Sequence, residues 1–84
     1  MRNPLNNIAM TRYKNLSGDS GVTAYAVTLD SIIVEFRDGP VYLYDYRIPG
    51  MRKVEAMKQL ARKGRGLATY INKYVRKLYI GKLR

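Results

Sequence analysis

The 84-residue sequence contains no cysteine and no histidine. The absence of cysteine excludes disulfides, thiolate catalysis and cysteine-based zinc sites. The absence of histidine removes the commonest general base and the commonest metal ligand. There are only six acidic residues, and no pair among them stands out as a catalytic dyad. We therefore expect a protein that is not an enzyme and that uses neither a metal nor a cofactor.

Long apolar runs are also missing. No stretch approaches the roughly 20 apolar residues that a membrane span requires. The opening stretch "MRNPLNNIAM" lacks the apolar core, roughly 7–15 residues long, of a secretory signal. Because the lack of cysteine also fits a reducing compartment, we expect a soluble, cytoplasmic protein without a membrane span.

Positive charge is concentrated in the second half of the chain. The net charge is +10. Residues 1–46 carry four basic and five acidic residues, which gives −1, whereas residues 47–84 carry twelve basic residues and one acid, which gives +11. Such a distribution is typical of a protein that binds a polyanion: nucleic acid, an anionic membrane surface or an acidic protein. A solvated helical face is the alternative that needs no ligand.

Hydrophobic periodicity predicts three strands followed by two helices. Residues 1–21 show little periodicity, so we expect an irregular N-terminal arm, and deletion of residues 1–15 should leave the fold intact. Strands are predicted at 22–29, 32–36 and 41–46, with turns at Asp30-Ser31 and "RDGP". A helix is predicted over 51–63, ended by Gly64. A second apolar stripe follows at Leu67, Ile71, Tyr74, Val75 and Leu78.

These elements predict one α+β domain over residues 22–84: a three-stranded antiparallel β-meander followed by two amphipathic helices packed on one face. A hairpin loop of two or four residues places Phe36 opposite Val41, and Val34 opposite Leu43. Leu29 is then expected opposite Ile32. The predicted core face consists of Tyr25, Val27, Leu29, Ile32, Val34, Phe36, Val41 and Leu43. The opposite face carries a row of tyrosines at every second position: Tyr42, Tyr44 and Tyr46.

Two stretches carry a resemblance to a known family. The first is "IIVEFRDGPVYLYDYRIP", with Tyr42 and Tyr44 as a Tyr-x-Tyr pair, and the second is "GLATYINKYVRKLY", through Gly66, Tyr70, Asn72, Val75 and Arg76. Together they resemble the KTSC domain, a bacterial module that is named for its position at the C-terminus of some lysyl-tRNA synthetases and that also occurs as a small stand-alone protein. The resemblance extends over residues 22–79. It implies this fold and RNA binding, the role suggested for the family.

Three groups of residues are candidates for the site. The tyrosine row is either a packed layer or a stacking platform for bases, and we take Tyr42, Tyr44 and Tyr70 as the stacking candidates. The candidates for phosphate contacts lie around "KGRG" and on the polar face of the second helix: Arg62, Lys63, Arg65, Lys73, Arg76 and Lys77. Each basic group also has a plain alternative, a solvated turn or a solvated helix face.

The sequence thus favours a small, non-catalytic nucleic-acid-binding module for RNA or single strands, which works by charge and aromatic stacking. The first alternative is a protein-interaction adaptor, such as a small phage or mobile-element protein that docks on an acidic host protein. The second alternative is membrane-surface association through the second helix. That alternative fails if Leu67, Ile71 and Leu78 are buried against the sheet.

Overall fold

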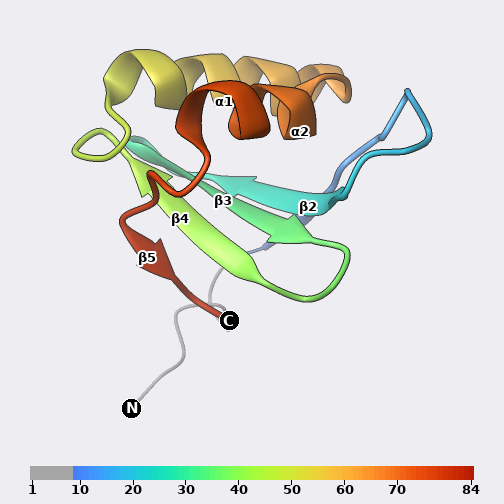
Figure 1. The fold of residues 1–84 in the computed structure, drawn as a ribbon, viewed down its shortest axis with the longest axis horizontal. Helices are drawn as coiled ribbons and strands as arrows, with labels where there is room; N and C mark the ends of the chain where they lie inside the picture. The colour runs from blue at the N-terminus through green and yellow to red at the C-terminus, as the bar shows by residue number, and fades with distance from the viewer. Residues whose placement is uncertain (1–8) are drawn as a thin grey trace.

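One antiparallel sheet of five strands carries both helices on one of its faces (Figure 1). The computed structural model describes residues 9–84. The strands, hydrogen-bonded in chain order, are β1 (Thr11–Arg12), β2 (Val22–Val27), β3 (Ser31–Phe36), β4 (Val41–Asp45) and β5 (Gly81–Lys82). The helices are α1 (Met51–Lys63) and α2 (Leu67–Tyr70), which continues as the π-helical turn η2 (Ile71–Val75). The α+β class is confirmed, and β1 and β5 extend the predicted meander at its two edges.

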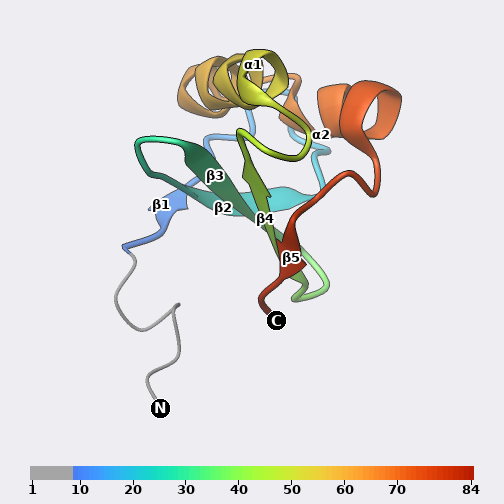
Figure 2. The same ribbon diagram turned by 90° about the vertical axis from the view of Figure 1, so that its left-hand side faces the viewer.

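The main core fills the space between the sheet and the helices. Figure 2 shows this arrangement from the side, with the C-terminus on the other side of the sheet from the helices. The buried residues of this core are Tyr13, Val22, Ile32, Val34, Tyr44, Val54, Met57, Ala61, Leu67, Ile71 and Val75. A smaller cluster of Ala26, Ile33 and Val41 lies on the opposite face of the sheet. Because Ile32 and Ile33 are neighbours in β3, they supply one residue to each cluster.

Helix α1 has the predicted bounds. Val54, Met57 and Ala61 are buried at helical spacing, which places one face of α1 on the sheet. Gly64 ends the helix with φ 82, and its N–H donates to the carbonyls of Leu60 and Ala61. A Cβ at Gly64 would also lie 2.6 Å from Cβ of Lys14. Glycine is therefore required here both by the backbone conformation and by the close approach of the N-terminal segment.

The predicted register of the β3–β4 hairpin is wrong by one residue. Val34 pairs with Tyr42, and Glu35 pairs with Val41. The N–H of Phe36 donates to the carbonyl of Pro40, so the loop holds three residues, 37–39, instead of two or four. An odd loop turns every side chain of the second strand to the other face. Val41 and Leu43 therefore leave the helix side, and Tyr42 and Tyr44 take their place.

The β2–β3 turn also differs from the prediction. It consists of Leu29-Asp30, because the N–H of Thr28 donates to the carbonyl of Ser31. Leu29, expected in the core, is 92% exposed at the tip of the turn. Val27 pairs with Ile32. Since the shift from the predicted pairing is an even number of residues, the remaining core residues of these two strands keep their predicted face.

The second helix buries only part of its predicted stripe. Leu67, Ile71 and Val75 are buried, but Tyr74 is 52% exposed and Leu78 is 47% exposed. Tyr74 is exposed because of the π-helical turn η2, in which the N–H of Arg76 donates to the carbonyl of Ile71, five residues earlier, whereas Leu78 lies beyond the end of this turn. This wider turn keeps residues at a spacing of four in line and rotates Tyr74 outward. No helix within residues 9–84 is long and apolar enough to cross a membrane.

The segment before β2 is packed where the structure describes it. Tyr13 is 3% exposed in the main core, and its hydroxyl accepts the N–H of Leu67 at 3.3 Å. The N–H of Leu16 donates to the carbonyl of Gly64 at 2.8 Å. This segment forms a strand only at residues 11–12 and has no helix or strand over residues 13–16, yet it is packed against the domain, which the sequence did not predict. The part of the predicted arm at residues 1–8 lies outside the described residues. Strand β1 has only two residues, so no periodicity could reveal it.

Candidate nucleic-acid interface

The tyrosines of β4 and the turn after it face the helices. Tyr44 is 1% exposed in the main core, and Tyr42 and Tyr46 are partly buried against that core. Burial raises the pKa of Tyr44 to about 12, with further contributions from Tyr42 and Tyr79. The row is thus a packed layer. Tyr44, predicted as a stacking residue, has no ring face open to a base.

Tyr46 belongs to a polar network that fastens α1 to the β2–β3 turn. Its hydroxyl donates to Glu55 at 2.7 Å, and Nζ of Lys58 lies 2.8 Å from the same carboxylate oxygen. Lys58 is 4% exposed and also donates to the carbonyls of Thr28 and Leu29. The hydrogen bond from Lys58, followed by that from Tyr46, lowers the pKa of Glu55. The ammonium group of Lys58 therefore contacts three oxygen atoms, which compensates its burial and connects α1 to the β2–β3 turn.

A hollow of about 340 Å³ opens between the β3–β4 hairpin and the chain after η2, and we call it the tyrosine hollow. The ring centroids of Tyr42 and Tyr79 are 4.4 Å apart within it. Its lining residues are Phe36, Asp38, Pro40, Tyr42, Tyr44, Ile71, Asn72, Arg76, Lys77 and Tyr79. Four predicted site residues meet here from distant parts of the sequence: Tyr42, Tyr44, Arg76 and Lys77. The two stretches that resemble the KTSC domain therefore line the same hollow.

Arg76 has an unusual backbone conformation. Its φ is 41 and its ψ is −111, and Asn15 is the only other non-glycine residue with a positive φ among residues 9–84. Non-glycine residues in such regions cost free energy and concentrate at functional sites, as do π-helical turns. The side chain of Arg76 is exposed at the rim of the tyrosine hollow. These observations make Arg76 the strongest candidate among the predicted basic residues.

A second hollow, of about 460 Å³, adjoins the first, and we call it the helix-end hollow. It is lined by Lys73, Tyr74, Val75, Arg76, Lys77 and Leu78, so it shares two residues with the tyrosine hollow. The ring of Tyr74 packs against that of Tyr70, with centroids 4.9 Å apart. Nζ of Lys73 lies 5.9 Å from the centroid of Tyr74. The exposed aromatic is therefore Tyr74, although the apolar stripe of the second helix predicts that it is buried.

The six predicted basic residues form two groups. Lys73, Arg76 and Lys77 border the two hollows, whereas Arg62, Lys63 and Arg65 lie at the junction of α1 and α2, at the other end of the second helix (Figure 1). All six are exposed, and none forms an ion pair within residues 9–84. The acidic residues in ion pairs, Glu35, Asp45 and Glu55, have Arg84, Arg47 and Lys58 as partners. The positive charge of the predicted site is therefore not neutralised internally.

Two further hollows continue this surface toward the N-terminal segment. One, of about 260 Å³, includes Asn72 of the tyrosine hollow and also Ser17, Asp19, Ser20 and Thr69. It shares Ser20 with a hollow of about 230 Å³ that Arg12 and Arg37 line. Each of the four hollows therefore shares at least one lining residue with the next, from the hollow lined by Arg12 to the hollow lined by Leu78. Arg12 and Arg37 are not among the basic residues predicted to contact phosphate, because both lie in the half of the chain with no net positive charge.

Comparison with family models, curated proteins and solved structures finds no match for this chain. The likeness to the KTSC domain therefore stays a prediction from the quoted residues. The described residues contain no group of three acidic side chains that could hold a metal ion.

Proposed function

We propose that this protein is a small, non-catalytic nucleic-acid-binding module of the KTSC type that prefers RNA or single strands. The observation that carries this proposal is the junction of two hollows at Arg76 and Lys77. There, two exposed cations that have no ion-pair partner within residues 9–84 lie between a pair of packed tyrosines and the exposed ring of Tyr74. Cationic grooves with aromatic surfaces are the common design for binding single strands.

The electrostatic attraction between the basic residues and the phosphates does not depend on the base sequence, so we expect the phosphates to bind first. Lys73, Arg76 and Lys77 would meet them beside the hollows, and Arg62, Lys63 and Arg65 would meet them farther along the strand. Two groups of cations at opposite ends of one helix suit an extended strand better than a compact anion. The amount of counterion released would determine how strongly salt weakens binding.

Bases would then stack on the aromatic surface. Tyr74 has the most exposed ring, and Tyr70 supports it from behind. Tyr42 offers less, because Tyr79 already packs on it. Stacking of this kind contributes about 1–3 kcal/mol per base and tolerates any sequence. It requires unpaired bases, and this requirement is why we favour single strands over duplex.

The chemistry of the acidic residues supports a non-catalytic role. Glu35, Asp45 and Glu55 are engaged in ion pairs. Burial alone would raise the pKa of Asp45, but the N–H groups of Ile48 and Arg47 and the Arg47 guanidinium lower it below its ordinary value. Such a carboxylate is held as a fixed hydrogen-bond acceptor at the end of β4 and is a poor general base.

A second candidate function is an adaptor that binds an acidic protein. The observation in its favour is that Leu78 and Tyr74 are both about half exposed and are bordered by Lys73, Arg76 and Lys77. Aromatic and arginine anchors with an apolar neighbour are typical of protein interfaces. The same exposed pair is also what membrane-surface association would need, and vesicles of anionic lipid test that alternative.

Fluorescence anisotropy with labelled single-stranded RNA, single-stranded DNA and duplex of equal length tests the proposal. We expect single strands to bind more tightly than duplex. Tyr74→Ala should weaken the binding of every single strand by about 1–3 kcal/mol without changing its salt dependence. The matched control is Tyr25→Phe, which keeps a packed ring away from the hollows. If none of these nucleic acids binds at about 50 mM salt, the adaptor becomes the better-supported function.

A further inference from the structure

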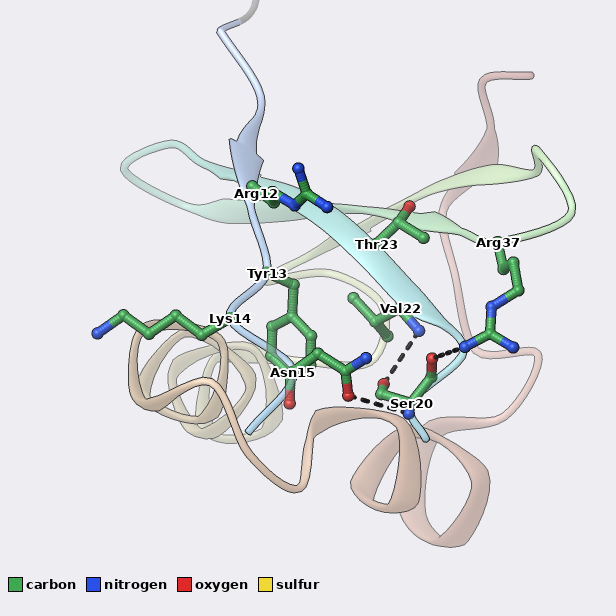
Figure 3. Close-up of a pocket in the computed structure, with 8 residues that line it drawn as sticks. All are labelled: Arg12, Tyr13, Lys14, Asn15, Ser20, Val22, Thr23 and Arg37. Atoms are coloured by element: carbon green, nitrogen blue, oxygen red, sulfur yellow. Dashed lines mark hydrogen bonds between the residues drawn. The ribbon is translucent and has the colours of Figure 1, made fainter. Parts of the chain in front are cut away.

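The hollow between β1, the start of β2 and Arg37 has the features of an anion site (Figure 3). Its volume is about 230 Å³, below the roughly 300–1,000 Å³ of sites for drug-sized ligands. No carboxylate lines it, in contrast to the tyrosine hollow, which includes Asp38. The lining residues are Arg12, Tyr13, Lys14, Asn15, Ser20, Val22, Thr23 and Arg37. We call it the arginine hollow.

Two donors of this hollow, Arg37 and Asn15, are held in place by hydrogen bonds within the protein. Nη2 of Arg37 donates to the carbonyl of Ser20 at 2.8 Å, which orients the guanidinium and leaves its other N–H groups available. Oδ1 of Asn15 accepts the N–H of Ser20 at 3.0 Å. Because a backbone N–H can only donate, the amide oxygen of Asn15 must face Ser20, and its NH₂ group faces the hollow. Figure 3 shows this nitrogen turned toward Val22.

The positive charge of the arginine hollow comes from two guanidinium groups. Arg12 extends over the hollow, opposite Arg37, whereas the amine of Lys14 points away from it (Figure 3). Neither arginine forms an ion pair in the part of the chain that the structure describes. Guanidinium groups bind phosphate through paired N–H donors, and a fixed amide adds one more donor. This donor set matches an oxyanion with several acceptor oxygens.

We propose that the arginine hollow binds a single phosphate group through Arg12, Arg37 and the amide of Asn15. The phosphate is that of a phosphomonoester at the end of a nucleic-acid strand, and this assignment of its source rests on the proposed function. The strand would then run from this anchor along the hollows that share Ser20 and Asn72 toward Arg76. A terminal phosphate carries more negative charge than a backbone phosphate, which suits two guanidinium groups.

The test compares three probes: inorganic phosphate, a single-stranded oligonucleotide with a 5′-phosphate and the same oligonucleotide with a 5′-hydroxyl. Backbone amide chemical shifts of Asn15, Ser20 and Thr23 report on the hollow directly. We expect all three to move with inorganic phosphate, and the 5′-phosphate to raise the affinity of the oligonucleotide about ten- to a hundredfold. Arg12→Ala, which removes no hydrogen bond within the described chain, should abolish both effects. Arg52→Ala removes the same charge from the start of α1 and should abolish neither.

The outcomes separate the two proposals. If inorganic phosphate does not move these amides, the phosphate site is refuted, even if the oligonucleotides bind. If inorganic phosphate moves them but neither the 5′-phosphate nor, on a further oligonucleotide of the same sequence, a 3′-phosphate gives an advantage, the assignment to a strand end is refuted. If no oligonucleotide binds while phosphate still moves the amides, the nucleic-acid function fails and the phosphate site stands.

Discussion

Replacing Tyr13 with alanine should destabilise the whole domain, although Tyr13 lies outside the region where the sequence predicts any structure. Its ring is buried among the helices and the sheet, and deletion of a large buried aromatic costs about 3–5 kcal/mol. A domain of this length has a stability of about 4–13 kcal/mol, at roughly 0.05–0.15 kcal/mol per residue. The substitution should therefore lower the melting temperature by at least about 10 °C. Thermal unfolding followed by circular dichroism measures this shift.

The hydroxyl of Tyr13 has a separate role that Tyr13→Phe isolates. Helix α2 begins after Gly66, which has no side chain to cap it, and the Tyr13 hydroxyl accepts the N–H of Leu67 instead. Tyr13→Phe leaves this buried N–H without a partner, which should cost about 1–3 kcal/mol. Tyr74→Ala is the matched control at an exposed tyrosine and should change the stability by less than about 0.5–1 kcal/mol. Equal losses for Tyr13→Ala and Tyr74→Ala would refute the packed N-terminal segment.

Three further predictions concern stability. Gly64→Ala should lower the free energy of unfolding, measured with urea, by more than about 1 kcal/mol. The loss should exceed that of Gly18→Ala, because both glycines have positive φ but only a Cβ at Gly64 meets Lys14. Equal losses would contradict this contact. The pKa of Glu55 is lowered in the folded protein, so the ionised carboxylate contributes to stability above its ordinary pKa of 4.5. This contribution is lost as the pH falls through the pKa of the folded state. Glu55→Gln should therefore make the stability depend less on pH in this acidic range, as acid unfolding experiments can measure. The pKa of Tyr44 is raised to about 12, so stability should fall as the pH rises above 10.0. Tyr44→Phe should make this fall smaller in alkaline unfolding experiments, and the hydrogen bond to Glu55, which raises the pKa of Tyr46, should leave a remainder.

Local signals predicted the elements but not how the strands pair. Helix α1 was found because its buried residues recur at helical spacing and Gly64 stops it. The predicted register of the β3–β4 hairpin was wrong because the turn stretch "RDGP" is compatible with loops of two, three or four residues. The three-residue loop with Gly39 at φ 107 is selected by packing, since it turns Tyr44 into the core. Strands β1 and β5 have two residues each, which is too short for any period.

The exposure of the candidate basic residues could be predicted from the sequence, whereas the exposure of the aromatic residues could not. The basic residues follow from composition, because exposed lysine and arginine need no particular packing to reach solvent. Which tyrosine is exposed depends on the π-helical turn at Ile71–Val75, and a pattern with a period of 3.6 residues assigns Tyr74 to the buried side. The hollows themselves join residues from both ends of the chain. They therefore depend on the tertiary fold, and no local pattern could reveal them.

Two charge-matched double variants show, through the salt dependence of their binding, whether the surface at Arg76 contacts phosphates. Lys73→Ala/Arg76→Ala removes two cations beside the hollows, and Arg52→Ala/Lys53→Ala removes two from the first turn of α1. On single-stranded RNA, the logarithm of the affinity should fall linearly with the logarithm of the salt concentration, with a slope of about −0.7 per phosphate neutralised. We expect the first variant to flatten this slope by about one to two units and the second to leave it unchanged. Equal slopes for the two variants would contradict a phosphate-binding surface at Arg76.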